Sequence, residues 1–131
     1  MGDMSDWVSD VGVVVTGAET SARDELASLL SDAAGFTVES QPIYELLDGD
    51  STVSASAIVV ADDPPASDGI DLFGEIRDAE LLCPVVLAGE DTERVEPALV
   101  AGVTDYVVCD EAWVEELTGR IRANVRRPVR D

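Results

Sequence analysis

The sequence predicts an α/β fold, in which a parallel β-sheet is covered by helices on both faces. Five short apolar runs, rich in valine and isoleucine, alternate with stretches in which apolar residues recur at helical spacing. Most of these runs are apolar throughout, which is typical of parallel strands that are buried on both faces. The 131 residues have the length of one domain, and a hydrophobic fraction of 46% suffices for a core.

The first half of the chain contains two strand patterns and a long helix pattern. Residues 11–15 are a continuous apolar run, which predicts a buried strand. The next helix begins near Ser21, a capping residue, and Gly35 ends it. Residues 36–39 alternate between apolar and polar types, which favours a second strand at the edge of the sheet. A short helix over 42–47 follows.

The second half repeats the same alternation. Strand patterns follow at 57–61, 84–88 and 106–108, and helix patterns begin at Asp68-Gly69 and span 93–101 and 111–126. Strict alternation of strands and helices, joined by right-handed crossovers, leaves few topologies. Five strands with five helices favour the flavodoxin-like strand order 2-1-3-4-5, whose ligand site lies at the carboxyl ends of the strands.

We expect a single domain over residues 11–126, preceded by a tail at 1–10. Residues 127–131 are either a tail or the beginning of a linker. The first ten residues are acidic and lack the basic and apolar regions of a signal peptide. No apolar run approaches the roughly 18 residues of a membrane span. The sequence therefore predicts a soluble cytoplasmic protein, and it leaves open whether the chain stands alone or belongs to a larger regulator or kinase.

The net charge of −20 comes from 28 acidic residues against eight arginines, with no lysine. Such a charge destabilises a compact state by self-repulsion, which molar salt relieves by shortening the Debye length to about 3 Å. We interpret the acidity as adaptation to the salt-rich cytoplasm of a halophile. A basic partner is the rival interpretation, but the acids are spread along the whole chain. The arginines near the C-terminus complement a helix dipole, so no nucleic-acid role is expected.

Histidine is absent, and the two cysteines, Cys83 and Cys109, lie far apart without a CxxC pattern. This composition excludes a conventional zinc site and histidine-based catalysis. Reduced, structural thiols are the simplest interpretation for a cytosolic protein.

Three stretches resemble the receiver domains of response regulators in two-component signalling. Residues 101–108, A-G-V-T-D-Y-V-V, resemble the family's A-G-x-x-D-Y-[IVL]-x. Residues 65–73 resemble its P-x-x-D-G-x-x-[LF], and residues 83–87 resemble its I-P-[VI]-[IV] entry to strand four. Order and spacing fit over 11–126. The resemblance implies a flavodoxin-like fold and a role in phosphorelay signal transduction.

The reactive residues of that family are missing at the matching positions. Receivers transfer a phosphoryl group to an aspartate after strand three, with Mg²⁺ held by two carboxylates after strand one. A hydroxyl after strand four and a lysine after strand five stabilise the product. The matching positions here are Thr16 and Gly17 for the acid pair, Ala61 for the nucleophile, Ala88 or Gly89 for the hydroxyl, and Cys109 for the lysine. We therefore expect a degenerate receiver, or pseudo-receiver, without enzymatic activity or a cofactor.

Three alternatives remain open around the acidic residues. Asp62, one residue beyond the nucleophile position, is a candidate displaced phosphoacceptor, which would need Mg²⁺. The simpler interpretation is that Asp62 and Asp63 form a solvated acidic turn. Glu19, Asp62 and Asp63 are weak candidates for a metal site. The loop from Thr16 to Ser21 partly matches a flavodoxin phosphate loop, which would indicate a flavin or nucleotide binder.

The resemblance also implies an interaction face. In the family, helix four, strand five and helix five mediate dimerisation or partner docking, and here Val95, Tyr106 and Trp113 fall on them. Trp113 could instead anchor the last helix in the core. Tyr106 occupies the position of the family's switch aromatic, and without the hydroxyl it would be locked in one rotamer. The expected partner is a kinase, an output domain or a second copy of the chain.

Overall fold

The protein is described by a computed structural model, which covers residues 12–17, 20–34, 37–47, 56–62, 68–109 and 112–125. The predicted tails at 1–10 and 127–131 lie outside the described residues. The elements in chain order are β1 (Gly12–Thr16), α2 (Thr20–Ala34), β2 (Thr37–Ser40), α3 (Ile43–Leu47), β3 (Ala57–Asp62), α4 (Gly69–Asp78), β4 (Val85–Gly89), the 3-10 helix η1 (Thr92–Arg94), α5 (Val95–Ala101), β5 (Asp105–Val108) and α6 (Trp113–Val125).

The five strands form one parallel sheet in the order β2-β1-β3-β4-β5, which confirms the predicted fold class and strand order. The alternating strand β2 lies at an edge, and the continuously apolar strands β1, β3 and β4 lie inside the sheet. Parallel strands that are buried on both faces have continuous apolar runs, as the three inner strands do. The other edge strand, β5, is also covered on both faces, since Tyr106 and Val107 are buried in opposite cores.

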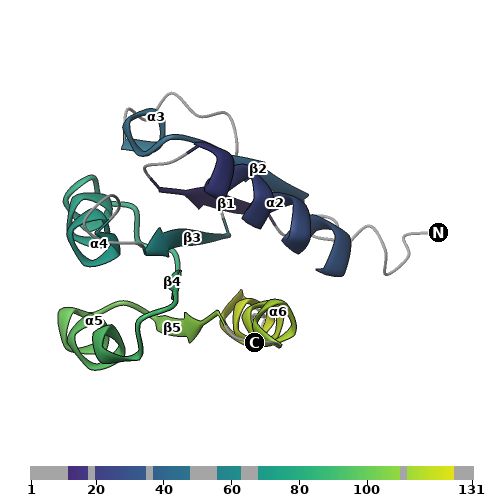
Figure 1. Ribbon diagram of the computed structural model, residues 1–131. Helices are drawn as coiled ribbons and strands as arrows, with labels where there is room; N and C mark the ends of the chain where they lie inside the picture. Colours follow the sequence, from purple (N-terminus) through teal and green to yellow (C-terminus); the bar gives the residue numbers. More distant parts are fainter. Residues whose placement is uncertain are drawn as a thin grey trace, which may run out of the picture.

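Helices cover both faces of the sheet (Figure 1). Helices α2 and α6 lie on one face, and α3, α4 and α5 lie on the other. Successive side chains of a strand point to opposite faces. Val13 and Val15 therefore belong to the core under α2 and α6, whereas Val14 belongs to the core under α4 and α5. Leu117 and Ile121 of α6, at the predicted spacing of four, are fully buried against the first of these cores.

The ends of the helices follow local chemistry. Asp68 caps α4, because its carboxylate accepts hydrogen bonds from the backbone N–H groups of Ile70 and Asp71 at 3.1 and 3.2 Å. Gly102 ends α5 in the left-handed conformation that glycine adopts most readily. The helix predicted over 93–101 is divided, since a turn of 3-10 helix precedes α5. Among the described residues, no helix has both the length and the apolarity needed to cross a membrane.

The register brings the carboxyl ends of three strands together. Asp62 of β3 pairs with Gly89 of β4, which in turn pairs with Val108 of β5. Thr16 ends β1 next to Val60 of β3. The positions that the sequence pattern singled out therefore lie along one edge of the sheet, where ligands bind in open α/β folds.

Candidate functional site

Asp62 ends β3 with its carboxylate inside the protein. The residue is only 5% exposed, and its side chain is fully buried. The expectation of a solvated acidic turn is therefore wrong for Asp62. A buried carboxylate requires a counter-charge and hydrogen bonds, because water no longer solvates it. The neighbouring elements supply both.

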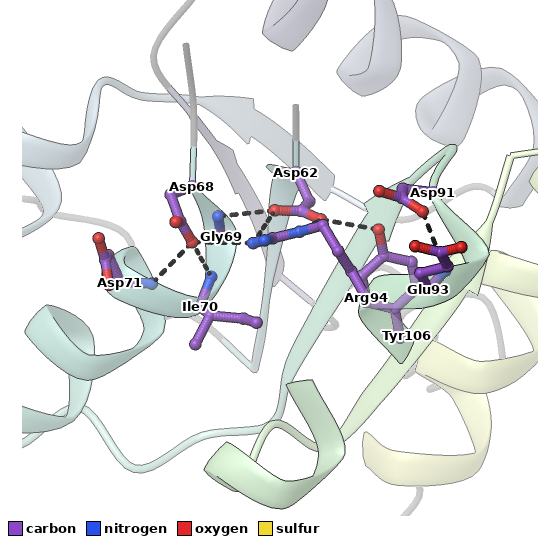
Figure 2. Close-up of polar contacts among 9 residues, drawn as sticks. All are labelled: Asp62, Asp68, Gly69, Ile70, Asp71, Asp91, Glu93, Arg94 and Tyr106. Carbon is purple, nitrogen blue, oxygen red and sulfur yellow. Dashed lines mark hydrogen bonds and ion pairs between the residues drawn. The ribbon is translucent and has the colours of Figure 1, made fainter. Parts of the chain in front are cut away.

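Four hydrogen bonds saturate the Asp62 carboxylate (Figure 2). Arg94 of η1 binds both oxygens, with Nε 2.8 Å from Oδ2 and Nη2 2.9 Å from Oδ1. The backbone N–H of Gly69 donates to Oδ1 at 2.8 Å, and the Tyr106 hydroxyl donates to Oδ2 at 2.7 Å. A carboxylate offers about four acceptor sites, so none remains for another ligand.

Arg94 also links Asp62 to the N-terminus of α4. Its Nη2 lies 2.8 Å from Oδ1 of Asp68, the residue that caps that helix. The two hydrogen bonds with Asp62, together with the one to Asp68, raise the pKa of Arg94. Burial works against ionisation of Asp68, but the backbone N–H of Asp71 and the Arg94 guanidinium lower its pKa. One arginine thus serves two carboxylates, in a fork geometry that lysine does not offer.

Tyr106 reaches Asp62 because position 89 is a glycine. A Cβ atom on Gly89 would collide with the Tyr106 hydroxyl and would lie 2.6 Å from the backbone oxygen of Asp62. Tyr106 is itself 5% exposed, and burial, with the hydrogen bond to Asp62, raises its pKa. The structure therefore holds this ring inward and packed under α4 and α5.

A pocket lies at the end of β3 on the other face of the sheet, beside α2 and α6. It has a volume of about 660 Å³ and lies among α2, α6 and the ends of β3, β4 and β5. Ala61, Ala88 and Cys109 line it, and these are the positions that match the nucleophile, the hydroxyl and the lysine of the receiver pattern. Asp62 also borders the pocket, although its side chain is fully buried. Ala61 pairs directly with Ala88 across the two strands. The structure thus brings the three positions together, without the side chains that phosphoryl transfer needs.

The positions that match the acid pair are also unsuited to that role. Thr16 is fully buried, and its hydroxyl has no hydrogen-bond partner among the described residues. Gly17 has a φ of 150°, and a Cβ atom there would lie 3.1 Å from that of Ala61. A side chain at this position would be strained and crowded. The other candidate acids, Glu19 and Asp63, lie outside the described residues, within which no group of three metal-ligating side chains is found.

The three residues of the predicted interaction face do not form one surface. Val95 and Tyr106 pack into the core under α4 and α5, whereas Trp113 packs against the core on the other face of the sheet. Tyr106 is buried rather than available to a partner. The pattern located the elements correctly, but the direction of each side chain depends on packing.

Neither Arg94 nor Gly69 was predicted to contact Asp62, although Asp68-Gly69 was predicted to begin a helix. A signal for Arg94 is present, since it is the only basic residue between Arg77 and Arg120, in a strongly acidic stretch that follows a strand. A buried acid near that strand end would require such a residue. Gly69 carries a signal for the start of α4, but none for a contact with Asp62. Its role follows from its backbone, because a Cβ atom there would meet Leu87 at 2.9 Å and Asp62 Oδ1 at 3.0 Å.

This geometry limits the chemistry of Asp62. Attack on phosphorus requires a free lone pair on a carboxylate oxygen, and metal binding requires the same. Both would require Arg94 or Tyr106 to leave a buried, charge-assisted network. The arrangement is therefore suited to holding η1, α4 and β5 in place.

Comparison with known proteins supports the fold. No family model matches the sequence, and no curated protein matches it. Solved structures do match. One is a receiver-domain protein from Clostridium thermocellum, with a TM-score of 0.71 and 17% identity over 88% of this chain and 94% of that one. Another is a two-component response regulator from Clostridium difficile, with a TM-score of 0.70 and 19% identity over 92% and 99%.

A third match is the receiver domain of a Francisella response regulator, with a TM-score of 0.66 and 20% identity over 88% and 96% of the two chains. The chain therefore has the fold of response-regulator receiver domains.

Proposed function

We propose that the chain is a receiver-like signal-transduction domain of a two-component or phosphorelay system, which acts by protein–protein contact without being phosphorylated. The observation that carries this proposal is the saturation of Asp62 by Arg94, Tyr106 and Gly69. The only carboxylate that the described part of β3 offers at its end is thereby withdrawn from chemistry. The domain would have neither an enzymatic activity nor a cofactor.

Three positions in the pocket support the same conclusion. Ala61 and Ala88 are neighbours across the sheet, and Cys109 lines the same space. Phosphorylation by the receiver reaction would need an aspartate at position 61, a hydroxyl at position 88 and a cation at position 109. None of the three side chains supplies one. All three reactive side chains of the receiver pattern are absent together, which favours a role that does not use phosphoryl transfer.

The Asp62 network also suggests how the domain signals. The inward Tyr106 is fixed by a buried hydrogen bond, so the switch aromatic would be locked in one rotamer. A locked domain presents one constant surface to its partner. We propose a kinase, an output domain or a second copy of the chain as that partner, in the cytoplasm of a halophile. The net charge of −20 supports the halophilic origin.

The proposal is tested by intact-mass analysis after incubation with acetyl phosphate and Mg²⁺ in molar KCl. We expect no phosphoryl adduct, while a receiver with an intact reactive set gains one under the same conditions. Circular dichroism in the same salt verifies that the protein is folded. An adduct that maps to Asp62 and disappears in Asp62→Asn would overturn the proposal and make Asp62 a displaced acceptor.

A positive test of the protein contact uses the intact protein as bait. We expect the wild-type chain to bind its partner with the same affinity whether or not acetyl phosphate and Mg²⁺ are present, because the saturated Asp62 carboxylate does not take part in binding. Binding that requires acetyl phosphate would contradict a phosphorylation-independent role.

A further inference from the structure

We propose that the pocket among α2, α6 and the ends of β3, β4 and β5 binds a small organic cation, namely an ammonium or guanidinium group on an apolar stem. This inference goes beyond the proposed function, and it does not depend on the identity of a protein partner.

The space in the pocket comes from small side chains at the sheet edge. Ala61 and Ala88 pair across the ends of β3 and β4 and line the pocket with their methyl groups, and Gly89 borders it. The resulting volume of about 660 Å³ lies within the range of small-molecule sites, roughly 300–1,000 Å³. The pocket can therefore take a whole small molecule as well as a single functional group.

Apolar side chains from two helices line the sides. Leu26 and Leu29 come from α2, and Trp113 comes from α6. Leu29 is 38% exposed, so its side chain leaves apolar surface at the pocket that a ligand can cover. An apolar stem would be stabilised here in proportion to the apolar area that it buries. An indole also attracts organic cations through its π-system.

The charges at the pocket have one sign. Glu25, Glu90 and Asp91 are exposed and line it, and no arginine is found among its described lining residues. The nearby Arg94 is already committed to Asp62 and Asp68. The pocket therefore attracts cations and repels phosphates and carboxylates, which argues against a flavin or nucleotide.

An inorganic cation fits less well than an organic one. Metal ions in proteins need several ligands converging on one point. No group of three ligating side chains is found within the described ranges, so these carboxylates act as separate negative charges. Separate charges with an aromatic and two leucines fit a cation that has an apolar body.

The test uses Trp113 as its own reporter. The chain has one other tryptophan, Trp7, so Trp7→Phe leaves Trp113 as the only indole. We expect pentylguanidinium to change the Trp113 fluorescence saturably, at the lowest KCl concentration that keeps the protein folded. Pentanol and pentanoate provide the same stem without the positive charge. An equal response to either of them, or no saturable response to pentylguanidinium, would overturn the proposal.

Paired variants separate the local charge from the net charge. In Glu25→Gln/Glu90→Gln we expect the affinity for pentylguanidinium to fall by about tenfold, since two exposed carboxylates each contribute a modest attraction. Glu75→Gln/Glu96→Gln changes the net charge by the same amount on α4 and α5, and should leave the affinity unchanged. Equal losses in both pairs would sink the idea of a specific site.

Cysteine labelling provides a readout independent of fluorescence. Cys109 lines the pocket, whereas Cys83 lies before β4, and neither forms a disulfide. Bound pentylguanidinium should slow the alkylation of Cys109 by iodoacetamide severalfold, relative to that of Cys83. Equal protection of both thiols would contradict binding in this pocket. A short arginine peptide with neutral flanks that binds tighter than pentylguanidinium would assign the cation to a partner's side chain, and weaker binding would assign it to a free molecule.

Discussion

The two sides of the β3 end differ sharply although they are built from consecutive residues. Asp62 points under α4 and α5, into a network in which each carboxylate oxygen accepts two hydrogen bonds. Ala61 lines an open pocket beside α2 and α6. Because the side chains of a strand alternate, a shift of one residue moves an acid from a solvent-accessible pocket into a packed network. The same residue type thus has a structural role on one side and would have a reactive one on the other.

The largest effect on stability is expected from Arg94→Met, on the Asp62 side of the strand end. This change leaves the buried Asp62 without its counter-charge, and should lower the free energy of unfolding by about 3 kcal/mol. Arg120→Met is the matched control, since Arg120 is 45% exposed and pairs only at the surface, so its loss should be below about 1 kcal/mol. Urea unfolding in constant KCl measures both. Similar losses would contradict the difference between a buried and a surface pair.

A methyl group at the contact of β4 and β5 tests the packing around Tyr106. Gly89→Ala should destabilise by about 1–3 kcal/mol, because the new Cβ would lie 2.6 Å from the backbone oxygen of Asp62. Gly74→Ala on α4 has open space around it and should stabilise by about 0.5–1 kcal/mol through helix propensity. Thermal unfolding of the two variants should therefore shift in opposite directions. An unchanged free energy of unfolding in Gly89→Ala would show that Tyr106 and the backbone at Asp62 can shift to make room for the methyl group.

Removing one hydroxyl tests a single hydrogen bond of the network. Tyr106→Phe takes away the donor to Asp62 Oδ2 and should cost about 1–2 kcal/mol, since a buried acceptor loses a partner. Urea unfolding measures the loss. In the Arg94→Met background the same change should cost a different amount, because the two donors share one carboxylate. Strict additivity would indicate that the two interactions are independent.

Alkaline pH provides a further test of the same hydroxyl. Burial raises the pKa of Tyr106 above its ordinary value of 10.0. Above pH 10 the unfolded chain releases this proton while the folded protein retains it, so the free energy of unfolding should fall as the pH rises. Tyr106→Phe should lack this part of the decline. In a Tyr44→Phe background, the phenolate absorbance reports on Tyr106 alone, and ionisation near pH 10 in the folded protein would refute the prediction.

The smallest effect on stability is expected on the pocket side of the strand end. Cys109→Ala removes a thiol that lines the pocket and is only partly buried, so the free energy of unfolding should change by less than about 1 kcal/mol. Urea unfolding again provides the measurement. A loss as large as that of Arg94→Met would mean that both sides of the strand end are structural.

Much of the fold could be predicted from the sequence. The uninterrupted apolar runs of β1, β3 and β4 indicated inner parallel strands, and the alternating β2 indicated an edge. Asp68-Gly69 marked the beginning of α4 correctly, because capping is a local interaction. The resemblance to the receiver pattern also singled out Ala61, Ala88 and Cys109, and the structure places all three in the lining of one pocket.

The site itself was only partly predictable. Asp62 was expected either in a solvated turn or as a displaced acceptor, and the ion pair with Arg94 was not foreseen. These two residues are 32 positions apart, and no local pattern connects them. Trp113 and Tyr106 were placed on one face, although α6 and β5 direct them to opposite sides of the sheet.

The sequence by itself determined the alternation of strands and helices, the order of the sheet and the absence of the reactive residues, because these depend on periodicity and on residue type along the chain. Only the tertiary structure decided that Asp62 is buried and saturated, that Gly89 makes room for Tyr106, and that a pocket remains beside Trp113. The physical reason is that burial, ion pairing and cavities arise between elements that are distant in sequence, where packing sets which side chains meet.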